Sequence, residues 1–96
     1  MEDQTVCGYT NWETFVVGLW ADNTEWAWNR LWSILKECGD VPEKAKPRLL
    51  SFYKREAYPL AKAGERPTRI DKYLVNWEEL VNDALNNWQA ERKYYA

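Results

Sequence analysis

The chain has 96 residues, a net charge of −2, seven tryptophans and no histidine. This length predicts one domain with a small core. No apolar run is long enough to span a membrane, and the polar residues 1–4 do not resemble a secretion signal, so we expect a cytoplasmic protein with Cys7 and Cys38 as free thiols. Without histidine or a glycine-rich phosphate loop, we expect no enzymatic activity, metal or cofactor.

The first expected helix runs from Thr10 to about residue 22, after a tail over residues 1–8 that we expect to be poorly ordered. Thr10 and Glu13 have the spacing of a capping box, in which each side chain satisfies a free backbone amide at the start of a helix. The apolar period that follows places Glu13 and Val17 on the outer side of the helix. The expected buried face consists of Trp12, Phe15, Val16, Leu19 and Trp20.

A second helix is expected to follow almost at once, with Asp22 or Asn23 as its cap and Gly39 just beyond its end. Trp26 does not fit the apolar face of this helix and points with Arg30 toward its polar side. The expected buried face consists of Trp28, Leu31, Trp32 and Leu35, flanked by Ala27, Ile34 and Cys38.

The third segment is less regular. The pattern predicts a helix over about 47–58, because Pro47 suits a first-turn position and Pro59 disfavours helical geometry at the residue before it. A short turn closing at Gly64 and a loop over 64–68 should follow.

The last segment has the clearest helical period. Its stripe runs from Ile70 through Trp77 and Trp88 to Tyr95, and Thr68 resembles a cap, so we expect one long helix. A break at Asn76, which could cap a shorter helix, is the alternative.

These segments predict an all-α fold, a small bundle of about four helices packed antiparallel or orthogonally, within one domain over residues 1–96. Large rings bury much apolar area each, so most tryptophans should belong to the core. We expect the following to be largely buried: Trp12, Trp20, Trp28, Trp32, Trp77 and Trp88.

The charges are segregated along the chain. Residues 1–41 carry seven acids and two bases, residues 42–69 three acids and eight bases, and residues 70–96 five acids and three bases. The basic segment allows three interpretations: a solvated face that balances the acidic helices, a surface for an acidic protein, or a nucleic-acid-binding surface over residues 44–69. Its basic residues are Lys44, Lys46, Arg48, Lys54, Arg55, Lys62, Arg66 and Arg69.

We expect a non-enzymatic binding protein whose partner is another protein or protein complex, with nucleic acid as the alternative partner. Interface energy is concentrated in Trp, Tyr and Arg, and Trp26 is the one tryptophan off its helical stripe. The alternative is that its ring folds back over the Asp22-Asn23 junction and packs on the first helix. A redox role for Cys7 or Cys38 is a weaker third hypothesis, because neither has an activating motif beside it. The expected partner surface consists of Trp26, Arg30, Arg48, Lys54, Arg55 and Arg66.

Residues 9–23 read YTNWETFVVGLWADN. This stretch resembles a family of small uncharacterised proteins of bacteriophages, plasmids and bacteria that share the pattern N-[WY]-E-T-W-N-V-x-L-W-x-D-N, matched here over residues 11–23. The chain departs from the pattern at Phe15 and Val16, where Trp and Asn are usual. The resemblance implies a gene on a mobile element and a counter-defence inhibitor, of the anti-CRISPR or anti-restriction type, that acts inside a bacterial cell.

Overall fold

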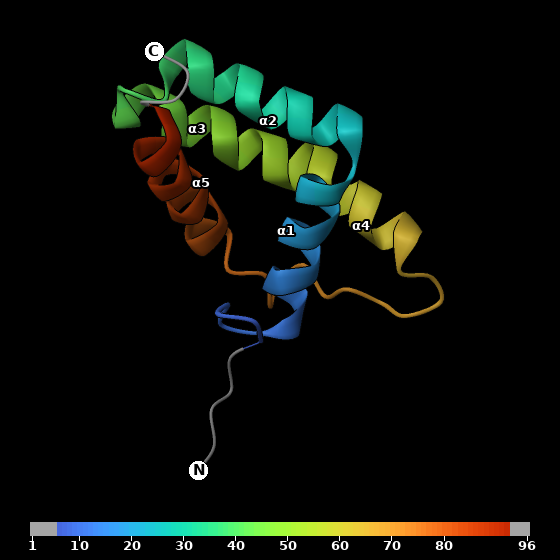
Figure 1. The fold of residues 1–96 in the computed structure, drawn as a ribbon. Coiled ribbons are helices and arrows are strands. Elements are labelled where there is room, and N and C mark those ends of the chain that lie inside the picture. The colour runs from blue at the N-terminus through green and yellow to red at the C-terminus, as the bar shows by residue number, and fades with distance from the viewer. Residues whose placement is uncertain (1–5, 93–96) are drawn as a thin grey trace.

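The structure, a computed structural model, describes residues 6–92. Its elements are α1 (Trp12–Asn23), α2 (Glu25–Cys38), α3 (Pro42–Phe52), the π-helix η1 (Tyr53–Ala57), α4 (Tyr58–Gly64) and α5 (Trp77–Glu91). Within the described residues there is no strand, only an isolated bridge between Val6 and Tyr9. The expected all-α class is therefore confirmed, since α3, η1 and α4 form one continuous rod and the bundle has four helical bodies (Figure 1).

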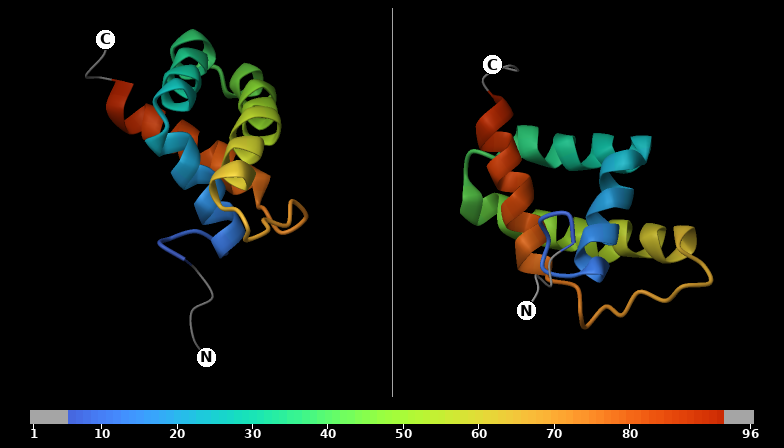
Figure 2. Two further views of the ribbon diagram at one scale, coloured as in Figure 1. Left: turned by 90° about the vertical axis from the view of Figure 1, so that its right-hand side faces the viewer. Right: turned by 60° about the horizontal axis from the view of Figure 1, so that its bottom comes forward.

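The helices pack in both of the expected ways. α2 lies antiparallel beside the α3–η1–α4 rod, and α1 and α5 cross these two helices steeply (Figure 2, right). α1 contacts α2, η1, α4 and α5, while α5 contacts α3, η1 and α1. Each helix thus covers part of one shared core. No helix among residues 6–92 is long and apolar enough to cross a membrane.

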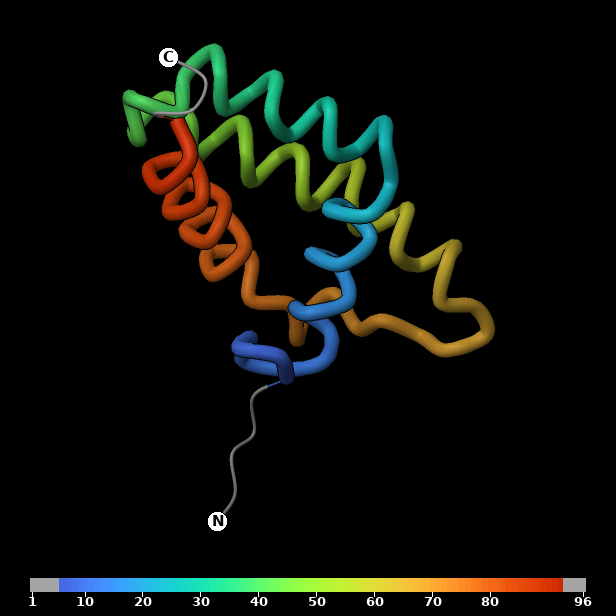
Figure 3. The backbone as a smooth tube through the Cα atoms, in the orientation of Figure 1, coloured from blue at the N-terminus to red at the C-terminus, as the bar shows by residue number. Residues whose placement is uncertain are grey.

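The α3–η1–α4 rod corrects two expectations for the third segment. The helix begins at Pro42 instead of near residue 47, and Pro47 lies inside the helix. The expected break before Pro59 is replaced by a π-turn, in which the amide of Tyr58 donates to the carbonyl of Tyr53, five residues back. Proline has no amide hydrogen to donate, and the wider turn lets the helix continue through Pro59 without a break (Figure 3).

The last helix starts at Trp77, so the expected single long helix is wrong and the break at Asn76 is correct. The side chain of Asn76 accepts a hydrogen bond from the amide of Glu79 at 3.0 Å, as a helix cap does. Residues 65–76 form a loop, which leaves Tyr73 85% exposed and Leu74 51% exposed although both fit the sequence stripe. The end of that stripe, Tyr95, lies outside the described residues.

Fewer tryptophan rings are buried in the core than expected. Trp32 and Trp88 are buried, with ring centroids 5.7 Å apart, whereas Trp28 is 39% exposed. Trp12, Trp20 and Trp77 pack against the core without being enclosed by it. The expectation is wrong for Trp28, while the other three rings are partly buried, since a domain this small cannot cover every large ring completely. The fully buried volume comes mainly from Phe52, Leu35, Leu49, Leu80, Val16 and Val17.

The buried face of α1 is rotated from the expected one. Val17, expected on the outer side, is fully buried, and Leu19, expected in the core, is 40% exposed. The face turns because Thr14 and Gly18, which an apolar count ignores, contact other elements. A side chain at Gly18 would press on Leu80 of α5, so this glycine lets two helices approach closely.

The helix ends also differ in detail. α1 is capped by Asn11 rather than Thr10, with the Thr14 amide donating to the Asn11 side chain at 2.9 Å. α2 begins after Thr24, so neither Asp22 nor Asn23 is its cap. Of the expected N-terminal tail, residues 1–5 lie outside the described part. Residues 6–9 form a tight turn in which Val6 and Tyr9 exchange backbone hydrogen bonds.

Candidate functional site

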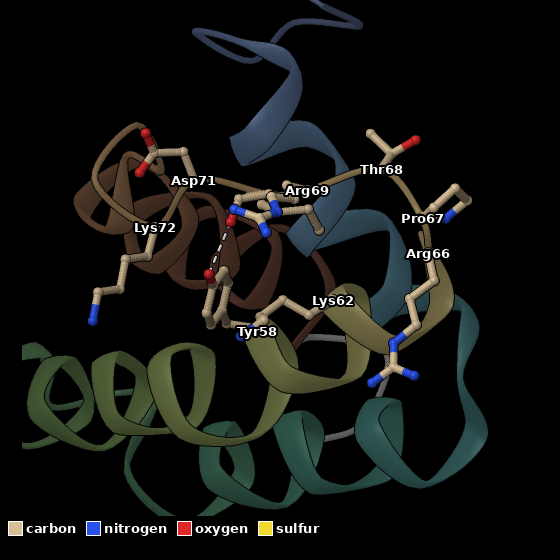
Figure 4. Close-up of a pocket in the computed structure, with 9 residues that line it drawn as sticks. Tyr58, Lys62, Arg66, Pro67, Thr68, Arg69, Asp71 and Lys72 are labelled. Carbon is tan, nitrogen blue, oxygen red and sulfur yellow. Dashed lines mark hydrogen bonds between the residues drawn. The ribbon is translucent and has the colours of Figure 1, made fainter.

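The loop between α4 and α5 gathers basic side chains around a hollow of about 840 Å³. In Figure 4, Arg66 and Lys72 lie at its two ends, with Arg69 between them. The hollow has one acidic side chain in its lining, that of Asp71. We name this surface the basic loop pocket and define it by Tyr58, Lys62, Arg66, Arg69, Ile70, Asp71 and Lys72.

The four cations of the basic loop pocket form no ion pair with any described carboxylate. Lys62 lies over the ring of Tyr58 at 5.4 Å from the centroid, and Lys72 lies over Tyr73 at the same distance. Arg66 and Arg69 are exposed. Four positive groups that lack a carboxylate partner attract an anion, and exposed arginines hold carboxylate or phosphate in a two-pronged geometry.

The first anchor of the loop is at its beginning. The indole nitrogen of Trp20 donates to Oε2 of Glu65 at 2.7 Å. The ring of Trp20 lies so close to Gly64 that a methyl group there would overlap it. The absence of a side chain at Gly64 therefore lets the ring of Trp20 pack on the last residue of α4, beside the start of the loop.

The middle and the end of the loop are anchored as well. The hydroxyl of Tyr58 donates to the carbonyl of Ile70 at 2.8 Å (Figure 4). At the end, Nδ2 of Asn11 donates to the carbonyl of Leu74 at 2.6 Å, and the amide of Asn76 donates to the hydroxyl of Thr14 at 2.8 Å. The loop is thus held at three points, which fixes the backbone that carries the cations.

Three residues of the 11–23 motif hold the loop between α4 and α5 by hydrogen bonds. Asn11, Thr14 and Trp20 all belong to α1 or its cap, and all three hold an end of the basic loop. The motif thus holds the loop through backbone atoms and Glu65, and these contacts do not use the basic side chains of the basic loop pocket. No sequence pattern in residues 65–76 predicts these three hydrogen bonds, because their partners are 45 to 63 residues apart along the chain.

Two of the expected partner-binding residues are engaged within the protein. Arg30 forms an ion pair with Glu56 at 3.3 Å, and Arg48 forms one with Glu37. Both pairs join α2 to the rod, and they are about two helical turns apart along α2. For these two arginines the interpretation of charge balance between acidic and basic helices agrees with the structure.

The other four expected residues lie in different surroundings. Trp26 is 51% exposed on α2, as expected from its place off the stripe. Lys54 lies over the ring of Trp77, 5.8 Å from its centroid, and Arg55 is exposed on η1. Arg66 is the only member of the expected surface in the lining of the basic loop pocket.

Sequence reasoning missed Lys72, Tyr73 and Leu74 as surface residues. The spacing of Tyr73 and Leu74 continues the stripe of α5 in phase, so the period predicts a helix that also includes Lys72. The signal that could have placed them in a loop is Asn76-Trp77-Glu78-Glu79, which repeats the helix-start chemistry of Asn11-Trp12-Glu13.

Neither cysteine lines the basic loop pocket. Cys7 is exposed and Cys38 is buried, and both are free. Among residues 6–92 no three Cys, Asp or Glu side chains are grouped so that they could hold a metal ion.

Comparison of the whole chain with protein-family models, curated proteins and solved structures finds no match in any of the three.

Proposed function

We propose that the protein is a non-enzymatic binding protein that docks an acidic segment of a partner protein on its basic loop pocket. The observation that carries the proposal is the group of four cations, Lys62, Arg66, Arg69 and Lys72, around one hollow and without carboxylate partners in the described chain. Tyr73 and Leu74 add exposed apolar surface beside it. Arginine, tyrosine and apolar groups at one place are typical of the energetic centre of a protein interface.

The surroundings of the pocket favour a protein over a nucleic acid. Directly after the loop, α5 begins with Glu78 and Glu79, which line an acidic surface together with Asp83. A duplex carries about one negative charge per 1.7 Å of its axis, so its backbone would meet these carboxylates beyond the pocket. A short acidic peptide segment would contact the four cations alone.

Nucleic acid is the second candidate, because one observation favours it. Tyr73 is 85% exposed beside Lys72, and an open ring next to a cation can stack on an unpaired base. This candidate predicts binding of single-stranded nucleic acid with a steep salt dependence.

The test compares charge reversal inside and outside the pocket. The probes are a fluorescent peptide of alternating Glu and Leu, its Gln analogue, and a single-stranded oligothymidine. Arg66→Glu/Arg69→Glu should weaken binding of the acidic peptide about tenfold or more, because two charge-assisted contacts become repulsive. The control Lys44→Glu/Lys46→Glu makes the same charge change on exposed residues of α3 and should alter the affinity less than about twofold.

Three results would contradict the proposal: equal binding of the Gln analogue, equal loss with both double variants, or no binding of the acidic peptide. Tighter binding of oligothymidine, with a salt slope near −3 for about four contacts, would establish the second candidate instead.

A finer part of the proposal concerns the identity of the partner. We propose that it belongs to a bacterial defence complex, of the CRISPR or restriction type. The support for this part is the resemblance of residues 11–23 to proteins of mobile elements. Expression of the chain should then raise the plating of a restricted phage, and Arg66→Glu/Arg69→Glu should abolish the rise while Lys44→Glu/Lys46→Glu keeps it.

A further inference from the structure

A second cavity lies among α1, α2, η1 and α5, and it shares no lining residue with the basic loop pocket. Its volume is about 310 Å³, near the lower end of the range for small-ligand sites. Three carboxylates from two helices line it: Asp22 at the end of α1, and Asp83 and Glu91 on α5. Neither Lys nor Arg is among its lining residues. We name it the acidic cleft.

The walls of the acidic cleft are aromatic. Trp28 and Trp32 of α2 line it, with their rings edge to face at a centroid distance of 5.2 Å. Trp28 is 39% exposed, so its ring reaches the mouth of the cleft. The hydroxyl of Tyr9 is held at the cleft by a 2.9 Å hydrogen bond that it donates to Asp83. Carboxylates beside indole rings are the surroundings in which a positive group on an apolar stem is stabilised.

The phenol of Tyr53 supplies an independent observation. Its side chain lines the acidic cleft from η1 and is only 4% exposed, and its hydroxyl makes no hydrogen bond with any described residue. Tyr53, Asp22 and Asp83 line the same cleft, and burial, followed by the charges of the two carboxylates, raises the pKa of Tyr53. Hydroxyls of buried side chains in folded proteins are nearly always hydrogen-bonded. The Tyr53 side chain lines the acidic cleft, so a group bound there would supply this hydroxyl with a partner.

We propose that the acidic cleft binds an organic cation, an alkylammonium or guanidinium group on an apolar chain, with its N–H groups donated to Asp22, Asp83 and the Tyr53 hydroxyl. The apolar chain would lie against Trp28 and Trp32. The same chemistry occurs in a free amine metabolite and in a Lys or Arg side chain of a partner protein. The site is independent of the proposed role of the basic loop pocket, so either can fail alone.

The probes are n-butylguanidinium, n-butylammonium and the neutral isostere n-butylurea, titrated by calorimetry. Both cations should bind, and n-butylurea should bind at least tenfold more weakly, because a charge-assisted contact exceeds a neutral one by about that factor. A capped Gly-Arg-Gly peptide separates the two sources. Tighter binding of the peptide indicates a partner side chain, and tighter binding of the small cation indicates a free amine.

Three variants locate the site. Asp22→Asn should weaken binding of n-butylguanidinium about tenfold, and Tyr53→Phe, which keeps the buried ring, should weaken it roughly threefold. The control Glu78→Gln removes one carboxylate from the exposed side of α5 and should change the affinity less than twofold. Equal affinity for n-butylurea, equal loss in Glu78→Gln and Asp22→Asn, or no binding at millimolar concentration would overturn the proposal.

Discussion

Several single residues shape this fold either because they leave room for a neighbouring side chain or because they position a hydrogen-bonding atom. Gly39 ends α2 with an ordinary right-handed helical φ of −61°, so its conformation does not require glycine. A side chain there would approach the Leu35 carbonyl to 2.5 Å and the Trp88 ring to 2.8 Å. The glycine is needed because the indole of Trp88 lies on the end of α2, where its Nε1 donates to Asp40 at 2.9 Å.

Asp22 gives a prediction at this scale. Partial burial of its carboxyl, and then the charge of Asp83, raise its pKa from 3.8 to about 6. The charged form is thus disfavoured in the folded state, and this group's contribution to stability is present below pH 4 and lost as the pH rises through 6. Asp22→Asn should therefore stabilise the protein at pH 8, by about 1 kcal/mol once solvent screening is allowed for, and should give no gain at pH 4.

Urea denaturation at both pH values measures this difference, and Asp40→Asn is the control with the opposite sign. Hydrogen bonds from Trp88 and Arg92 lower the pKa of Asp40, so its contribution is present above pH 4 and lost as the pH falls. Asp40→Asn should destabilise the protein at pH 8. An equal gain from Asp22→Asn at pH 4 and pH 8 would contradict the assignment.

At the scale of elements, the positions of helix ends depend on contacts between segments far apart in the chain. α5 could have begun near Thr68 on its apolar period alone. It begins at Trp77 because Thr14, fully buried in α1, accepts the amide of Asn76 and holds that residue outside the helix. The same hydrogen bond anchors the end of the loop that carries the basic loop pocket, so one hydroxyl links the start of α5 to the candidate site.

Thr14→Val should cost about 1–3 kcal/mol of stability, because valine keeps the shape of the side chain and leaves the Asn76 amide without an acceptor. Hydrogen exchange at residues 74–79 should accelerate more than exchange in α2. The matched control is Thr68→Val, on an exposed loop residue, which should change stability by less than about 0.5 kcal/mol. An unchanged melting temperature for Thr14→Val would show that this hydrogen bond does not hold the loop.

At the scale of the whole molecule, opposite charges collect at separate places. The basic loop pocket lies between α4 and α5, and the acidic cleft lies among α1, α2, η1 and α5. Ion pairs such as Arg30–Glu56 and Arg48–Glu37 neutralise charge where α2 meets the rod. A net charge of −2 therefore conceals two surfaces of opposite sign, each suited to a different ligand.

The core itself yields the prediction at this scale. Trp32 packs between Trp28 and Trp88, so Trp32→Ala should cost about 3–5 kcal/mol, a large share of the stability of a domain this small. Trp26→Ala, on a ring that is 51% exposed, should change stability by less than about 0.5 kcal/mol. Chemical denaturation of the two variants checks both values. Similar losses would mean that the core is not centred on Trp32.

The sequence by itself determined the helical class and the end of α2 at Gly39, because these depend on periodicity and on end signals a few residues apart. Tertiary structure decided the rotation of α1, the π-turn that carries the rod past Pro59 and the start of α5. It also decided which of the expected partner-surface residues are engaged within the protein, because Arg30 and Arg48 pair with Glu56 and Glu37. The physical reason is that a cap, a close approach or an ion pair depends on the partner the fold brings near, and that partner can be more than 60 residues away, as Thr14 is from Asn76.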